Sequence, residues 1–133
     1  MVSIVNRQVR EESSHDSALE IAIGVAQLLD SKRAREVKVL DVRALLPITS
    51  YFVIAEGGST RAVRGLADSA ARFLRTSPYQ RRGVESDSEG RWVCVDYSEV
   101  VVHVFDRAAR EFYDLEHLWR EAPNVAFPPL AAT

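Results

Sequence analysis

Two carboxylates and a glycine-serine turn give this chain its clearest candidate for catalytic chemistry. Glu85 and Asp87 have the spacing of a Mg²⁺-holding pair, and Gly58-Ser59 precedes a predicted helix, as in a nucleotidyltransferase. The two carboxylates, however, lie in a segment rich in Ser and Gly that indicates a turn rather than a strand. A turn positions a metal ion poorly. We therefore favour a solvated turn here and keep a small Mg²⁺-dependent nucleotidyltransferase as the alternative function.

Nucleophilic catalysis is less well supported by the residues present. Ser98, His103 and Asp96 are the residue types of a hydrolase triad, but no Gly-x-Ser-x-Gly turn surrounds the serine. Cys94 with His103 meets a similar objection, because a cysteine alternating along a strand is typical of packing. The three histidines have no Cys or His partner at the spacing of a metal site. The sequence thus predicts no catalytic residue, metal or cofactor, and we expect a protein that is not an enzyme.

Length and composition are typical of one globular domain. The chain has 133 residues, 47% of them hydrophobic and 27% charged, with a formal net charge of -2. A domain of this size can bury a core without a disulfide, and the single Cys94 cannot pair within the chain. A free thiol favours a reducing compartment, so we expect a cytoplasmic protein. The N-terminal residues lack the apolar run of a secretory signal, and no stretch has the length of a membrane span.

Hydrophobic periodicity and turn residues predict the elements that position these side chains. They indicate a helix over 16–34 capped by Asp16 or Ser17, strands over 37–42 and 51–55, a helix from Ser59 or Thr60 to 74, a strand end within 83–90, an antiparallel hairpin or two adjacent strands over 91–97 and 99–105, and a helix from Asp106 to near Trp119. This order predicts a single α/β domain over 16–121, with a mixed β-sheet flanked by helices. We expect a disordered tail over 1–15 and a Pro-rich tail over 122–133, either flexible or packed on the surface.

The stretch from Trp92 to Trp119 favours protein binding over catalysis. Strand alternation places Trp92, Cys94 and Asp96 on one side of their strand, and Tyr113 and His117 are four residues apart on the predicted last helix. Trp and Tyr are favoured anchors of protein interfaces. The alternative is structural: His103 forms a hydrogen bond within the fold, and the helix turns Phe112, Leu115 and Trp119 to the core.

Arginines gather on the second predicted helix and just after it. The chain has 15 Arg and only 2 Lys, and Asp68 is the single carboxylate among Arg61, Arg64, Arg72 and Arg75 on this helix, with Arg81 and Arg82 beyond it. Such a face binds RNA by neutralising phosphates, or it is simply a solvated helix face. A general RNA-binding module is therefore a third candidate function.

Seven runs of residues, in their order and spacing from about residue 18 to 119, resemble the Iojap-like ribosomal silencing factor family. They are LDV at 40–42, ITSYFVI at 48–54, GSTR at 58–61, GVE at 83–85, WVCVDY at 92–97, VVVHVF at 100–105 and YDLEHLW at 113–119. The resemblance implies a nucleotidyltransferase-like core that catalyses no reaction. It also implies a translation repressor that binds the large ribosomal subunit through ribosomal protein L14 and blocks association with the small subunit.

The same resemblance implies a set of partner-binding residues. Carried over position by position, they are Trp92, Asp96, Val100 and His103 on the two strands and Tyr113, Leu115, Glu116 and Trp119 on the last helix. The Arg face is a candidate contact for ribosomal RNA. In the free state we expect a monomer or a weak homodimer.

Overall fold

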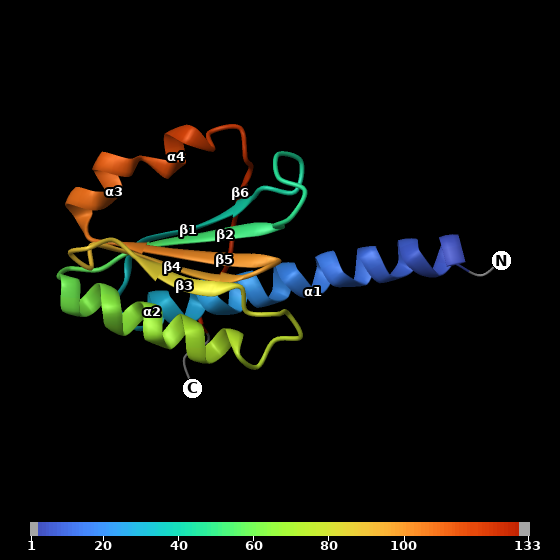
Figure 1. Ribbon diagram of the computed structural model, residues 1–133, viewed down its shortest axis with the longest axis horizontal. Coiled ribbons are helices and arrows are strands. Elements are labelled where there is room, and N and C mark those ends of the chain that lie inside the picture. Colours follow the sequence, from blue (N-terminus) through green and yellow to red (C-terminus); the bar gives the residue numbers. More distant parts are fainter. Residues whose placement is uncertain (1–2, 131–133) are drawn as a thin grey trace.

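A six-stranded mixed β-sheet forms the centre of the fold in the computed structural model, which describes residues 3–130 and the side chains from Ser17 onward (Figure 1). Its strands, in spatial order, are β3 (Gly83–Ser86), β4 (Trp92–Tyr97), β5 (Val100–Phe105), β2 (Tyr51–Glu56), β1 (Arg35–Asp41) and β6 (Asn124–Val125). β2 and β5 run parallel, and every other neighbouring pair is antiparallel. The predicted α/β class and mixed sheet are confirmed.

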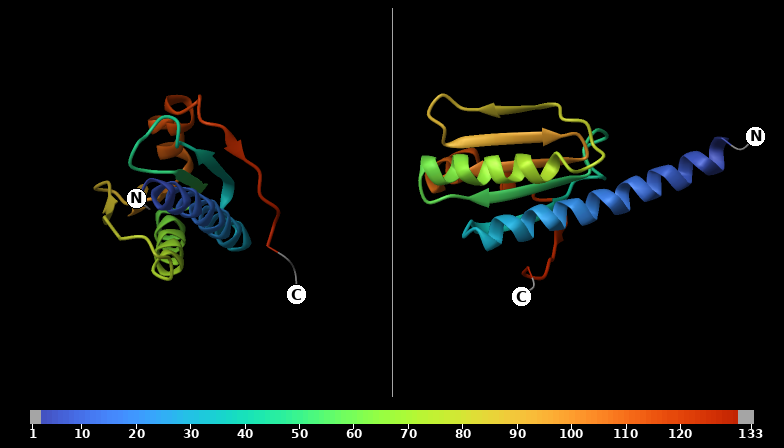
Figure 2. Two further views of the ribbon diagram at one scale, coloured as in Figure 1. Left: turned by 90° about the vertical axis from the view of Figure 1, so that its right-hand side faces the viewer. Right: turned by 90° about the horizontal axis from the view of Figure 1, so that it is seen from below.

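Helices cover both faces of the sheet, so the strands separate two cores. Figures 1 and 2 show α1 (Ser3–Ser31) and α2 (Thr60–Leu74) on one face, and α3 (Arg107–Tyr113) and α4 (Leu115–Leu118) on the other. β2 and β5 are buried along their whole length and supply side chains to both cores. β4 alternates: Val93 and Val95 face α1 and α2, whereas Trp92 and Cys94 face the other core, as predicted.

Helix α1 buries one side between Ala18 and Leu29, as predicted, but its start was predicted wrongly. It begins at Ser3 rather than at Asp16 or Ser17, so residues 3–15 of the predicted disordered tail are helical here. No Gly or Pro between Ser3 and Ile23 interrupts the helix. Asp16 and Ser17, the predicted caps, lower helix stability too little to end it when they lie in its interior. None of the helices among the described residues has the length and apolar composition to span a lipid bilayer.

Close packing of α1 on α2 depends on a glycine. A Cβ added at Gly24 would lie 2.7 Å from Cζ of Phe73, so this position keeps the two helices together. The predicted caps are confirmed on the helices that follow strands. Ser59 Oγ accepts a hydrogen bond from the N–H of Ala62 at 3.0 Å, and the Asp106 carboxylate accepts one from Ala109 at 2.8 Å.

The last predicted helix is in fact two helices. Asp114 adopts the left-handed conformation, with φ 48° and ψ 54°, and so ends α3 and starts α4. Asp tolerates this conformation better than most residues. Because the chain turns at Asp114, Tyr113 and His117 are not stacked one helical turn apart, which corrects the sequence interpretation.

The Pro-rich C-terminal segment packs on the domain as far as the structure describes it. β6 adds to the edge of β1, and the N–H of Asp41 donates to the carbonyl of Pro123 at 2.9 Å. Gln27 Nε2 on α1 donates to the carbonyl of Pro128 at 3.0 Å. Of the two alternatives for this segment, surface packing therefore holds for residues 124–128, and residues 131–133 lie outside the described part.

Candidate functional site

An aromatic cluster lies under α3 and α4, on the face of the sheet opposite α1 and α2. Trp92 is paired across the β4–β5 ladder with Phe105, and their ring centroids are 5.2 Å apart. The Trp92 ring also lies 5.8 Å from His103 and 4.5 Å from Tyr113, which comes from the end of α3. Three of the predicted binding residues are thus brought together, although they are up to 21 positions apart in sequence.

A neighbouring part of the same cluster anchors α4. The Phe52 ring on β2 meets Trp119 at 5.7 Å and His103 at 4.9 Å, both in edge-on geometry. Leu115 packs against the same core. Leu115 and Trp119 are half-buried here, so part of each side chain holds α4 on the sheet and part remains at the surface. We use the term aromatic cluster for Phe52, Trp92, His103, Phe105, Tyr113 and Trp119.

His103 is a buried, neutral member of the cluster rather than a catalytic base. It is only 7% exposed, and its Nδ1 accepts a hydrogen bond from Trp92 Nε1 at 3.2 Å. The neutral ring therefore carries its proton on Nε2, which is buried and has no hydrogen-bond partner among the described residues. Burial lowers the pKa of His103 from 6.5 to about 4, and the nearby charge of Asp96 opposes this only in part. The structural interpretation of His103 fits this geometry.

This low pKa makes the stability of the protein depend on pH. Between pH 6.5 and about 4 the unfolded chain binds a proton at His103 that the folded chain does not, so stability falls as the pH falls. We expect urea unfolding to show a loss of about 2 kcal/mol between pH 7.5 and pH 5 that is absent from His103→Gln. The same slope in both proteins would rule out His103 as its source.

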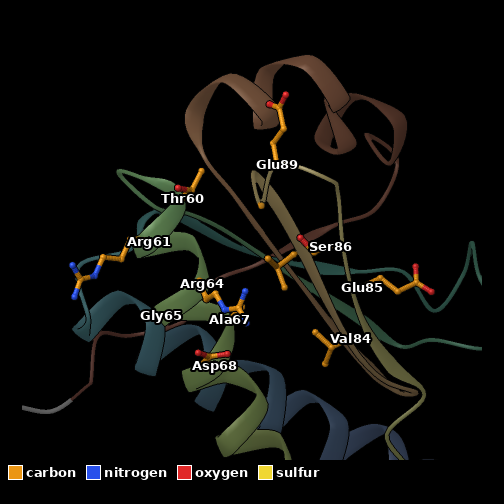
Figure 3. Close-up of a pocket in the computed structure, with 12 residues that line it drawn as sticks. Thr60, Arg61, Arg64, Gly65, Ala67, Asp68, Val84, Glu85, Ser86 and Glu89 are labelled. Atoms are coloured by element: carbon orange, nitrogen blue, oxygen red, sulfur yellow. The ribbon is translucent and has the colours of Figure 1, made fainter.

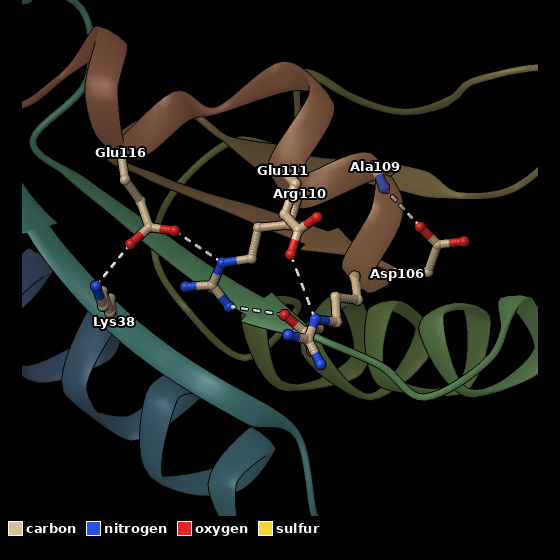
Figure 4. Close-up of polar contacts among 8 residues, drawn as sticks. Lys38, Asp106, Ala109, Arg110, Glu111 and Glu116 are labelled. Atoms are coloured by element: carbon tan, nitrogen blue, oxygen red, sulfur yellow. Dashed lines mark hydrogen bonds and ion pairs between the residues drawn. The ribbon is translucent and has the colours of Figure 1, made fainter.

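Glu116 belongs to an ionic network that ties α4 to the rest of the fold (Figure 4). Its carboxylate accepts hydrogen bonds from Lys38 Nζ on β1 at 2.6 Å and from Arg110 Nε on α3 at 2.8 Å. Arg110 is itself buried, and its Nη1 lies 3.9 Å from Oε1 of the buried Glu56. Partial burial raises the pKa of Glu116, but the hydrogen bonds from Arg110 and Lys38 outweigh it and hold that pKa below its ordinary value.

Asp96 lies at the rim of this face and fixes the segment before β3. It accepts hydrogen bonds from Arg82 Nε at 3.0 Å and from the N–H of Ser98 at 2.9 Å. Arg82 is therefore held by Asp96 and does not extend the predicted basic face. Burial, and then the charges of Asp96 and Glu85, raise the pKa of the Cys94 thiol to about 11, so this cysteine stays protonated.

Val100 is separated from the other predicted binding residues. It is fully buried in the core under α1 and α2, whereas His103, three positions later on β5, faces α3 and α4. An odd spacing along a strand puts two side chains on opposite faces. Val100 therefore belongs to the core and offers no surface to a partner.

Three apolar side chains on α3 and α4 are exposed beside the cluster. Phe112 is 74% exposed, Leu118 63% and Tyr113 43%. The structural alternative for this helix, in which Phe112 faces the core, is therefore wrong for Phe112, and no sequence pattern indicated Leu118. The helical repeat puts Phe112 nearly opposite Arg110, and because Arg110 is the buried residue, the apolar ring points outward. We call Phe112, Tyr113 and Leu118 the apolar surface.

The residues needed for the nucleotidyltransferase alternative do not form a site. Glu85 lies on β3, which corrects its predicted turn position, and Figure 3 shows its carboxylate directed away from α2. Asp87 accepts hydrogen bonds from the N–H groups of Arg91 and Trp92, and the Ser59 hydroxyl caps α2. Within the described residues, no three His, Cys, Asp or Glu side chains are grouped so that they could hold a metal ion.

Comparison with known proteins connects this chain to a family. Residues 15–133 match the family described as ribosomal silencing factor during starvation. The chain belongs to this family. The ribosomal silencing factor RsfS of Bacillus subtilis is 37% identical over 107 residues, which cover 80% of this chain and 88% of that protein. The name of this relative refers to a regulatory role at the ribosome rather than to a catalysed reaction.

Two further relatives extend the comparison. Mitochondrial assembly of ribosomal large subunit protein 1 of Mus musculus is 32% identical over 100 residues, covering 71% of this chain and 43% of that protein. A crystal structure of a Chromobacterium violaceum protein is 32% identical, with a TM-score of 0.69, and the match covers 88% of this chain and 94% of that one. The expected family resemblance is therefore confirmed.

Proposed function

We propose that this protein represses translation by binding the large ribosomal subunit through ribosomal protein L14 and blocking association with the small subunit. Membership of the ribosomal silencing factor family supports the silencing role, and the name of the mouse relative refers to the large subunit. The observation that carries the proposal is the apolar surface, where Phe112, Tyr113 and Leu118 are exposed on two consecutive helices. The protein acts in the cytoplasm, as a monomer or weak homodimer before it binds.

The apolar surface is suited to docking because the structure behind it is rigid. Tyr113 lies against Trp92, and α4 is held by Glu116 and Trp119, so a partner would meet side chains that are already ordered. Ordered aromatic side chains lose little entropy on binding and are frequent interface anchors. In this proposal Trp92, Asp96, Tyr113, Leu115, Glu116 and Trp119 form or border the interface, and His103 positions Trp92 from beneath.

The proposed mechanism is excluded volume and needs no reaction. A standard interface buries about 800 Å² on each partner, which is available on a domain of this size. A domain bound where the small subunit would dock prevents joining without changing any covalent bond. The core is proposed to be a nucleotidyltransferase-like scaffold in which Asp87 has a structural role. Ribosomal RNA is proposed as a second partner in the bound state.

Subunit joining tests this function directly. Purified large and small subunits are mixed with excess protein and separated on a sucrose gradient. We expect fewer whole ribosomes, with the protein sedimenting in the large-subunit fraction, and binding of isolated L14 in a pull-down. Excluded volume also predicts that protein added after joining is less effective than protein added before. An undiminished yield of whole ribosomes at large excess would overturn the proposal.

A further inference from the structure

A row of arginines lies along the exposed side of α2, on the opposite face of the sheet from the apolar surface. Arg61, Arg64, Asp68, Arg72 and Arg75 are separated by three, four, four and three positions. With 3.6 residues per turn, these spacings place all five side chains within about 80° around the helix axis. The row is about 21 Å long at a rise of 1.5 Å per residue. We call these four arginines the basic row.

The charge of the basic row is not neutralised within the described part of the chain. All four arginines are exposed, and none of them forms an ion pair there. Arg82, by contrast, is paired with Asp96. The basic row and Asp68 together carry a charge of +3, on a protein whose formal net charge is -2. Positive charge is thus concentrated along the exposed side of α2.

A groove between α2 and β3 lies alongside the row. One part of it has a volume of about 580 Å³ and is lined by Arg72, Arg75 and Arg81 with Tyr97 and Val84. A second part lies between α2 and the β3–β4 hairpin (Figure 3) and is lined by Arg61 and Arg64, but also by Asp68, Glu85 and Glu89, so the part beside Arg72, Arg75 and Arg81 is the more favourable for an anion. The groove gives an extended ligand a path along the arginines rather than a single contact.

We propose that the basic row binds the sugar-phosphate backbone of ribosomal RNA. The class of partner follows from charge complementarity, because guanidinium groups stay charged and match phosphate oxygens with two parallel hydrogen bonds. A row of four arginines over one extended path suits a repeating anion better than it suits the scattered carboxylates of a folded protein. That the RNA is ribosomal rests on the proposed function.

The basic row and the apolar surface are independent, since the sheet lies between them (Figure 1). L14 bound at α3 and α4 leaves α2 free, so the two contacts can be made by different parts of the ribosome. Changes in one surface should therefore leave the other contact intact. A test of RNA binding by the basic row can therefore give either result without deciding whether the protein binds L14.

Fluorescence anisotropy with a labelled single-stranded oligouridylate and a labelled RNA hairpin tests the inference. Four phosphate contacts predict a slope of about -3 in log affinity against log salt, or a loss of about 50-fold between 50 and 200 mM salt. Arg72→Gln with Arg75→Gln should halve this slope and weaken binding by about tenfold at the lower salt. Asp68→Asn should tighten binding several-fold, because it removes the only carboxylate in the row.

A matched control variant loses the same two positive charges outside the basic row. Lys32→Gln with Arg33→Gln changes two exposed cations in the turn after α1, and we expect less than a twofold effect. Equal losses in the two double variants, or unchanged binding in Arg72→Gln with Arg75→Gln, would overturn the inference. So would displacement of RNA by polyglutamate at the same charge concentration, which would indicate an acidic protein partner. If Arg72→Gln with Arg75→Gln still bound L14, a failure of RNA binding would not count against the proposed function.

Discussion

Replacing Phe112 and Leu118 together by aspartate is expected to lower the affinity for the large ribosomal subunit by about 100-fold or more. Central interface anchors typically cost about 2 kcal/mol or more each when truncated, and every 1.4 kcal/mol is a factor of ten. A carboxylate in place of an anchor adds the cost of burying an unpaired charge in the interface. Cosedimentation of the variant with purified large subunits, over a range of protein concentrations, measures the loss.

The fold should survive this double substitution, because both side chains are mostly exposed. A urea unfolding midpoint close to that of the unchanged protein would establish this. Leu130→Asp is a suitable control, since Leu130 is an exposed apolar residue in the C-terminal segment, away from α3 and α4. Wild-type cosedimentation by a folded Phe112→Asp, Leu118→Asp protein would remove the apolar surface from the binding site.

Arg110→Met is expected to reduce the free energy of unfolding by about 3 to 5 kcal/mol. Removing one partner of a buried ion pair leaves the other charge without compensation, which is the costly case. Glu56 is buried and faces Arg110, whereas Glu116 keeps Lys38 and is partly exposed. The loss should therefore come mainly from Glu56, and urea unfolding at neutral pH measures it.

A second substitution identifies the cause of this loss. Arg110→Met combined with Glu56→Gln removes the uncompensated charge, so we expect it to recover a large part of the lost stability. If the double variant were less stable than Arg110→Met alone, packing of the arginine rather than charge pairing would be its main contribution. A loss below about 1 kcal/mol in Arg110→Met would contradict the network as a source of stability.

Local patterns predicted the elements on which the site is built, because their signals lie within a few residues. The buried run at Tyr51 and the hairpin around Ser98 have strand periodicity, and the Ser59 and Asp106 caps act on the helices directly after them. The helix start at Ser3 was missed, because no nearby residue forces a boundary and the potential caps remain inside the helix.

The ionic network could not be predicted from sequence, since it joins residues that only the sheet brings together. Lys38 is on β1, Glu56 at the end of β2, and Arg110 and Glu116 are on two helices separated by the turn at Asp114. Burial of Arg110 then decides which side of α3 faces outward, and so exposes Phe112. The position of Val100, by contrast, could have been predicted from sequence. Val100 and His103 are three residues apart on one strand, and this odd spacing puts their side chains on opposite faces of β5.

The aromatic cluster also gives the protein an optical property. The chain contains two tryptophans, Trp92 and Trp119, and both lie in the cluster beside the apolar surface. All tryptophan emission of the protein therefore originates next to the proposed L14 contact, with one indole hydrogen-bonded to an imidazole and the other edge-on to a phenyl ring. Tryptophan fluorescence consequently reports on this face without an added label, whereas the groove beside the basic row contains Tyr97 but no tryptophan.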